Sequence, residues 1–212
     1  MCLWLWRKVQ LDGELNMKRW MLNSLLILMT TVPPAAYGSG NPAYEAANLI
    51  QQDRPSEALK ILNAELRLHP NNKDAYQSRA LAYFTLGDYI RACSDYTRVI
   101  SMDKRNVAAY QTRAYCWDYL GKGEKAIEDF TIVIKLTPND DEPYHYRAEQ
   151  NLKMKRYKEA IADSNESLRL HPKHLRAYYY RAKAFDMLGE TQKAASDREE
   201  IAKLLKQEKA SQ

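Results

Sequence analysis

Glycine, proline, cysteine and phenylalanine are all scarce in this chain of 212 residues, which holds 7 Gly, 8 Pro, 3 Cys and 3 Phe. Low glycine and proline, together with 45% apolar residues, exclude a disordered chain. The abundant residues include Ala, Leu, Lys, Glu, Arg and Gln, whose side chains lose little freedom on a helical backbone. The composition therefore predicts an all-α protein.

Motifs that carry catalysis or cofactor binding are also missing. The sequence has no glycine-rich phosphate loop, no Gly-x-Ser-x-Gly and no His-Glu-x-x-His. Its four histidines are His69, His145, His171 and His174, and their spacing is not that of a zinc site. His69 and His171 also occupy the same place in the repeat described below. We therefore expect no enzyme activity, no catalytic residue, no cofactor and no metal site.

A stripe of positive charge is lacking as well, although the formal net charge is +5 and the pI is about 8.9. Lys and Arg alternate with Asp and Glu along the whole sequence. A phosphate-binding surface needs clustered cations that release counterions. We therefore expect no nucleic acid among the partners.

One apolar stretch, residues 20–32, follows Lys18 and Arg19 and precedes Pro33 and Pro34. A cationic start, an apolar stretch and then helix-breaking and small residues form the layout of a secretory signal peptide. The alternative is an uncleaved leader that anchors the chain in a membrane. That alternative is weaker because polar residues interrupt the stretch, which is shorter than the ~20 residues that span a bilayer.

We expect cleavage after Gly38, with Ala36 as the second choice, so that the mature chain begins at Ser39. The protein would then be periplasmic or secreted. Residues 1–16 precede the pattern awkwardly, so we take Met17 as the start of the signal peptide. Residues 1–38 are thus expected to hold a short extension and the signal peptide.

Several residue types recur every 34 residues, which indicates an array of repeated units. The recurring residues are Ala46, Ala80, Ala114, Ala148 and Ala182; Ala58, Ala92, Ala126, Ala160 and Ala194; Tyr76, Tyr110, Tyr144 and Tyr178; and Leu68, Met102, Leu136, Leu170 and Leu204. Each unit has two stretches with helical apolar spacing around a turn, which carries Gly87, Gly121 or Gly189 in three units. The unit is therefore a helical hairpin, in which alanines let two backbones approach closely.

Residues 76–92, YQSRALAYFTLGDYIRA, resemble the tetratricopeptide repeat family. Its 34-residue unit has an early Trp or Tyr, Gly-x-Tyr at the turn, then Ala, an aromatic residue and a final Pro. The resemblance implies an all-α, right-handed superhelical α-solenoid of five antiparallel hairpins. Its units are residues 39–72, 73–106, 107–140, 141–174 and 175–208, the last with a capping helix.

Departures from the family pattern are local. The first unit is degenerate, with Pro42 and Pro55 where aromatic residues are expected. The third unit has Gly123 for the turn aromatic, and the fourth has Lys155 for the turn glycine. These changes weaken single units without breaking the register.

In the resembled family, first-helix side chains line a concave groove that binds extended or helical peptides. The positions that the resemblance carries over are Gln77, Leu81, Phe84, Gln111, Tyr115, Asp118, Tyr119, His145, Tyr146, Glu149, Tyr179, Tyr180, Lys183 and Asp186. Tyrosine, which dominates this set, offers a large contact area with few rotors to freeze. The alternative is that several of these rings pack between units.

Some relatives clamp the C-terminal carboxylate of chaperones with Lys and Asn at set groove positions. The corresponding positions in the first three units hold Ala43 and Ala47, Gln77 and Leu81, and Gln111 and Tyr115. We therefore expect no chaperone carboxylate-clamp ligand.

Two further patterns concern charge and sulfur. Arginine early in a unit is followed sixteen residues later by aspartate, in Arg79 and Asp95, Arg113 and Asp129, Arg147 and Asp163, and Arg181 and Asp197. This predicts one structural ion pair per unit. Cys93 and Cys116 fall on neighbouring helices, where they could form a disulfide or remain two separate buried thiols.

The sequence thus predicts an exported adaptor that binds a protein or peptide through a Tyr-rich groove. The alternative is a structural subunit of an envelope complex or an array that associates with itself.

Overall fold

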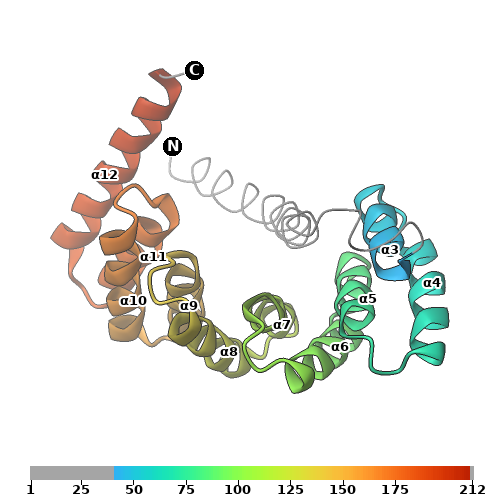
Figure 1. The fold of residues 1–212 in the computed structure, drawn as a ribbon. Coiled ribbons are helices and arrows are strands. Elements are labelled where there is room, and N and C mark those ends of the chain that lie inside the picture. Colours follow the sequence, from blue (N-terminus) through green and yellow to red (C-terminus); the bar gives the residue numbers. More distant parts are fainter. Residues whose placement is uncertain (1–40, 211–212) are drawn as a thin grey trace. The chain divides into compact units, whose positions relative to one another are not determined.

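The structure, a computed structural model, describes residues 41–210, and this part of the chain contains ten α-helices and no strand (Figure 1). Successive helices form antiparallel hairpins joined by short turns, as Figure 1 shows. The chain is therefore an all-α solenoid of helical hairpins. The predicted extension and signal peptide, residues 1–38, lie outside the described residues. None of the described helices is long and apolar enough to cross a membrane.

The chain divides into two compact units, the first ending at Thr112 and the second beginning at Arg113. In the first unit the structure describes α3 (Pro42–Gln51), α4 (Pro55–Leu68), α5 (Lys73–Thr85), α6 (Tyr89–Met102) and the start of α7 (Val107–Tyr119). Its core contains Ala46, Ile50, Ala58, Leu62, Leu66, Ala75, Leu81 and Ala82.

The second unit holds the end of α7, then α8 (Gly123–Leu136), α9 (Glu142–Lys153), α10 (Tyr157–Leu170), α11 (Leu175–Met187) and α12 (Thr191–Ala210). Each of α8 to α11 packs against the next helix along the chain, and α9 also packs against α11. The first helices of neighbouring hairpins are thus in contact, which places side chains from equivalent repeat positions near one another.

The alanines of both predicted series are buried. Nine of the ten are 0% exposed, and Ala182 is 3% exposed. Larger side chains there would push helices apart, and overpacking of this kind costs about 1–3 kcal/mol. The 34-residue period of the alanines therefore marks the positions where helices pack closely against each other.

In three hairpins, the residue before the first helix caps it with a side-chain hydrogen bond. The side-chain oxygens of Asn72 and Asn106 accept the backbone N–H three residues on, at 3.1 and 2.9 Å. His174 stands at the equivalent position of the last hairpin, where its Nδ1 accepts the N–H of Ala177 at 3.3 Å. Three hairpins thus start with the same local geometry, and in one of them a histidine replaces the asparagine.

The turn inside each hairpin requires a left-handed backbone. Gly87, Gly121 and Gly189 have φ of 80°, 68° and 77°. At the same repeat position Asp53 and Lys155 have φ of 58° and 61°. The turn geometry is therefore kept even where the glycine is not, at a steric cost that glycine does not carry.

Replacing Lys155 with glycine should raise the free energy of unfolding of the second unit by up to about 1 kcal/mol, because a left-handed non-glycine residue is strained. Urea unfolding followed by circular dichroism measures this change. Lys158→Gly, in the first turn of α10, is the control and should lower stability. A lower free energy of unfolding in Lys155→Gly would contradict the proposal that the left-handed backbone of Lys155 is strained.

The predicted ion pairs form within every hairpin that carries the Arg and Asp residues. In each, the arginine Nε and Nη2 donate to the two oxygens of one carboxylate at 2.6–3.0 Å. The aspartates are buried, with 3–6% of each residue exposed. In the first of these pairs, the hydrogen bond to Asp95 raises the pKa of Arg79 above its ordinary value. These pairs join the two helices of a hairpin.

Three of these arginines also contact the preceding hairpin. The Nη1 of Arg79 donates to Asn63 at 2.9 Å, that of Arg147 to Thr131 at 3.0 Å, and that of Arg181 to Asn165 at 2.7 Å. One guanidinium therefore holds its own hairpin together and attaches it to the hairpin before it.

The two cysteines of the described chain fall in different units, Cys93 on α6 and Cys116 on α7. Each is a buried thiol in the structure. The disulfide and the pair of separate thiols both stay predictions of the sequence.

Candidate functional site

The first helices carry the predicted groove residues, and in the first unit most of these residues are buried. Leu81 and Phe84 on α5 are 3% and 1% exposed, and the Phe84 ring packs edge-on against Tyr89 at 5.2 Å between centroids. Gln77 is half-buried and accepts a hydrogen bond from the Nδ2 of Asn106 at 3.3 Å. Gln111 on α7 is buried. These side chains mainly join helices of the unit.

In the second unit, Tyr115, Tyr146 and Phe130 form an aromatic cluster. Tyr115 lies edge-on to Phe130 at 5.6 Å and to Tyr146 at 4.9 Å between centroids, and Phe130 and Tyr146 stack at 5.7 Å. Tyr115 and Tyr146 are buried, and burial raises the pKa of Tyr146. These two predicted recognition residues therefore pack inside the fold, as the alternative interpretation of the rings had it.

A polar network lies along α7, α9 and α11 of the same unit. The Tyr180 hydroxyl donates to Glu149 Oε2 at 2.7 Å. Lys153 Nζ lies 3.0 Å from Glu149 Oε1 and 2.8 Å from Asp118 Oδ1. Burial and the Glu149 charge raise the pKa of Tyr180 well above its usual range. Burial lowers the pKa of Lys153, but the two carboxylates outweigh it and leave that pKa raised.

Four other predicted groove residues of the second unit are more accessible. Tyr119 is 37% exposed, and Lys183 is exposed. Lys183 Nζ lies 5.1 Å from the centroid of the half-buried Tyr179 ring, within the range of a cation–π contact. Asp186 forms an ion pair with Arg198. We call Tyr119, Tyr179 and Lys183 the accessible groove residues.

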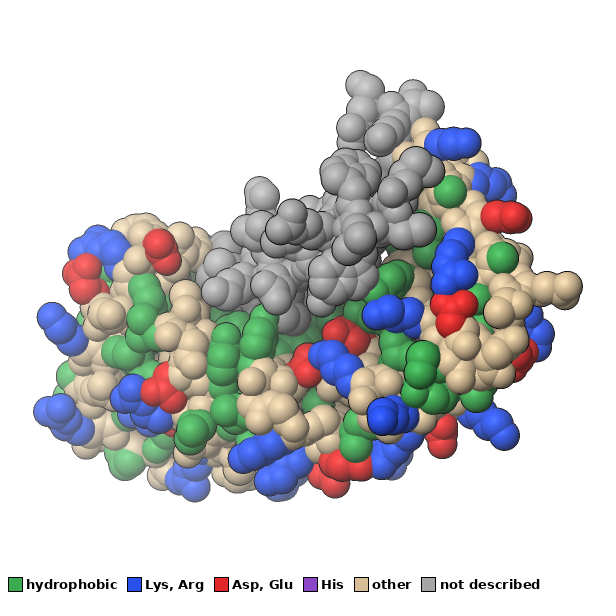
Figure 2. All heavy atoms as spheres, turned by 180° about the vertical axis from the view of Figure 1, so that it is seen from behind, with side chains coloured by type: hydrophobic (Ala, Val, Ile, Leu, Met, Phe, Trp, Pro, Cys, Tyr) green, Lys and Arg blue, Asp and Glu red, His purple; other side chains and the backbone are tan. Residues whose placement is uncertain are grey.

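Charges of both signs share the face of the molecule that Figure 2 shows. Figure 2 shows Lys and Arg interspersed with Asp and Glu over the face in view. An interspersed pattern favours contact with a polypeptide of mixed charge over contact with a phosphate backbone.

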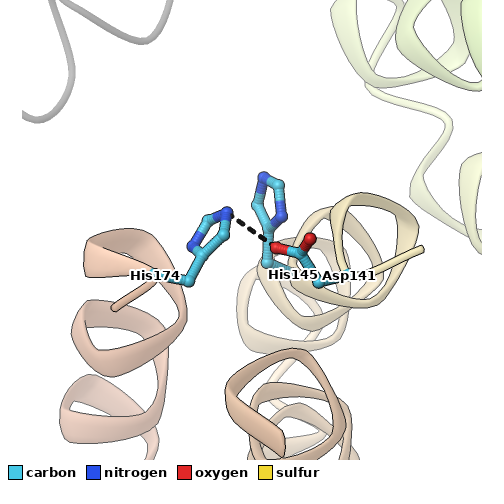
Figure 3. A group of neighbouring side chains, drawn as sticks. All are labelled: Asp141, His145 and His174. Carbon is cyan, nitrogen blue, oxygen red and sulfur yellow. Dashed lines mark ion pairs between the residues drawn. The ribbon is translucent and has the colours of Figure 1, made fainter. Parts of the chain in front are cut away.

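His145, the remaining predicted groove residue, is 2% exposed and lies beside Asp141 and His174 (Figure 3). Its two ring nitrogens have no hydrogen-bond partner in the structure. Burial, then His174 and Arg176, lower the pKa of His145 well below its usual value. Burial likewise lowers the pKa of His174 to about 4, against the opposing charge of Asp141. Both rings are therefore neutral at neutral pH.

Spacing along the sequence does not reveal this cluster, but the repeat register does. Where other units have Gln77 and Gln111, the fourth unit has His145; where they have Asn72 and Asn106, the start of the fifth has His174. The sequence could have revealed the cluster because two repeat positions, at the starts of neighbouring first helices, both change to histidine.

An array of helical hairpins with a 34-residue period, buried alanines at fixed positions and a proline-bearing turn between units defines a tetratricopeptide-repeat protein. The family model described as the ETO1 C-terminal domain matches residues 56–207, and the chain belongs to this family.

Sequence and structural relatives agree with this assignment. The pea (Pisum sativum) protein named translocon at the outer membrane of chloroplasts 64 is 38% identical over 64 residues, which are 30% of this chain and 11% of the pea protein. MamA from Desulfovibrio magneticus RS-1 superposes with a TM-score of 0.73 at 17% identity, covering 79% of this chain and 97% of that chain. A tetratricopeptide repeat protein from Parabacteroides merdae gives 0.71 at 21% identity, covering 78% and 68%. The two structures show a shared fold.

Proposed function

We propose that this chain is an exported adaptor that binds a protein or peptide partner along the first helices of its second unit. The observation that carries the proposal is the set of accessible groove residues, two tyrosines and a lysine on α7 and α11. Aromatic residues with a polar tip, next to a cation, are typical of binding hot spots. A tetratricopeptide-repeat fold without a recognised catalytic motif is consistent with this role.

Export is the second part of the proposal. It is supported by the cationic, apolar and small-residue pattern between Met17 and Gly38. Sequencing the N-terminus of the native protein, with cell fractionation, tests this part separately. We expect a chain that begins at Ser39 outside the cytosol. A native chain that keeps the leader and stays in the cytosol would contradict export and leave partner binding untouched.

The binding test replaces Tyr119, Tyr179 and Lys183 with alanine together. Tyr115 and Tyr146 are left unchanged, because their removal would damage the aromatic cluster and confuse binding with stability. A partner crosslinked to the wild type in the envelope fraction is identified, purified and titrated against each variant. Losing two or three hot-spot contacts should weaken binding by at least about 30-fold.

The matched control replaces Glu128, Lys135 and Lys158 with alanine, three exposed residues on the second helices α8 and α10. This variant should bind the partner as the wild type does. Equal affinity of the wild type, the groove variant and the control variant for the partner would refute binding through the accessible groove residues. Sedimentation at several concentrations distinguishes the structural-subunit alternative, in which the chain assembles with itself and the groove variant assembles unchanged.

A further inference from the structure

Four potential metal ligands gather where α9 and α11 begin and α10 ends. Asp141 precedes α9, His145 lies in its first turn, His171 ends α10 and His174 caps α11. One ligand atom from each of Asp141, His145 and His174 lies within 4.8 Å of the others. Figure 3 shows the three side chains meeting between the two helices. The cluster lies wholly within the second unit.

The cluster is unusual because one of its histidines is buried and several of its polar atoms have no hydrogen bond. His145 is 2% exposed, and neither of its ring nitrogens has a hydrogen-bond partner. Asp141 Oδ2 is also buried without a hydrogen bond, although it lies 3.5 Å from His174 Nε2 and 3.4 Å from His171 Nδ1. Buried polar atoms are normally satisfied, and a group of unsatisfied ones requires an explanation, of which a bound ion is one.

The distances suit a small divalent ion. Zinc–nitrogen bonds of about 2.0–2.1 Å in a tetrahedral site place neighbouring ligand atoms about 3.3 Å apart. The two distances from Asp141 Oδ2 to histidine nitrogens, 3.4 and 3.5 Å, are close to this value. The ligand atoms of Asp141, His145 and His174 all lie within 4.8 Å of one another, so the side chains would have to move closer to share one ion.

We propose that Asp141, His145 and His174 bind a divalent transition-metal ion of the zinc type, with His171 as the fourth ligand. Imidazole nitrogens with one carboxylate suit zinc and its neighbours, whereas magnesium and calcium prefer oxygen ligands. This site is independent of the accessible groove residues and of the proposed partner.

The electrostatics of the site can accommodate the ion. Both imidazoles are neutral and each carries one lone pair, so a ring can bind a metal by a change of tautomer, without losing a proton to solvent. The positive charge of Arg176, which contributes to the lowered pKa of both rings, opposes a cation. Asp141 supplies the compensating negative charge.

Binding through His174 Nε2 changes the tautomer of that ring. Nδ1 accepts the Ala177 N–H in the structure, so the ring proton is on Nε2. The metal displaces this proton, which moves to Nδ1, and the capping hydrogen bond is lost in exchange for a metal–nitrogen bond. The ion would then connect the first helices of two successive hairpins, in place of a local cap.

The repeat itself supplies conservative test variants. His145→Gln installs the residue found at Gln77 and Gln111, and His174→Asn installs the capping residue found at Asn72 and Asn106. Both should fold, because other hairpins of the same chain use these residues at these positions. His69→Ala is the control, since His69 occupies the repeat position of His171 and is exposed.

The experiment uses the full chain without a polyhistidine tag, stripped of metal and titrated with ZnCl₂ by calorimetry, with MgCl₂ in parallel. We expect one zinc ion per chain, no magnesium binding, and a rise in melting temperature with zinc for the wild type and His69→Ala. His145→Gln and His174→Asn should lose more than about 100-fold in zinc affinity and show no rise. His171→Ala should weaken binding without abolishing it.

Substitution with Co²⁺ checks the geometry, because a tetrahedral cobalt site absorbs visible light far more strongly than an octahedral one. The wild type should give the intense spectrum and His145→Gln should not. A wild type that binds no zinc, or a His145→Gln variant that binds as tightly as the wild type, would overturn the proposal. Circular dichroism of each variant verifies that a lost site is not a lost fold.

Discussion

Replacing Asp129 with alanine should lower the free energy of unfolding by about 3 kcal/mol, because it leaves the partly buried guanidinium of Arg113 without its carboxylate. Arg113 donates two hydrogen bonds to Asp129, of 2.8 and 2.7 Å. The Asp129 side chain is 4% exposed and the Arg113 side chain 16%. The partial exposure of Arg113 places the effect at the low end of values for broken buried pairs. Urea unfolding followed by circular dichroism measures it.

The control for this prediction is Glu128→Ala, the exposed neighbour on α8. It should change stability by less than about 0.5 kcal/mol. The double variant Arg113→Met with Asp129→Leu removes both charges and should recover much of the loss, because no unpaired charge then remains. An Asp129→Ala protein as stable as the wild type would show that the pair carries no net interaction.

Replacing Phe130 with alanine should cost about 3–5 kcal/mol, since a fully buried aromatic ring is lost and a cavity remains. Phe130 is 1% exposed and contacts both Tyr115 and Tyr146. The near-ultraviolet circular dichroism of the tyrosines should weaken at the same time. Chemical unfolding of the full chain measures the stability change.

Phe130→Leu keeps most of the volume and should cost clearly less than the alanine change. Tyr119→Ala, which removes a ring that is 37% exposed, should cost less than about 1 kcal/mol. Equal losses for Phe130→Ala and Tyr119→Ala would contradict the aromatic cluster. The comparison also separates buried rings that stabilise the fold from more exposed rings such as that of Tyr119.

The fold could be predicted from the sequence because its determinants are local and repeated. The step from Ala80 to Ala114 to Ala148 reports the same helix contact each time, and the pairing of Arg113 with Asp129 follows from one offset. The left-handed turn at Lys155 could not be predicted from residue type. It follows from the register, which imposes the neighbouring hairpins' geometry on a lysine.

The site was less accessible to sequence reasoning because it depends on which face of a helix a ring occupies. Tyr115 and Tyr119 are four residues apart on α7, yet one is buried against Phe130 and the other is exposed. Only the packing of the next helices distinguishes them. The cluster of His145 and His174 likewise comes from the contact between α9 and α11, which places residues 29 positions apart side by side.

The hydrogen bond from arginine Nη1 to the preceding hairpin favours folding of the hairpins in order from the N-terminal side. Arg147 donates a hydrogen bond to Thr131, and Arg181 donates one to Asn165. In both cases the acceptor lies on the preceding hairpin. During synthesis the N-terminal hairpins leave the ribosome first, so each newly made arginine meets an acceptor that is already in place. In a fragment truncated at its C-terminus, every such arginine keeps its acceptor. In a fragment that begins at α9, Arg147 has lost its acceptor, Thr131. The chain is thus suited to folding one hairpin at a time from its beginning.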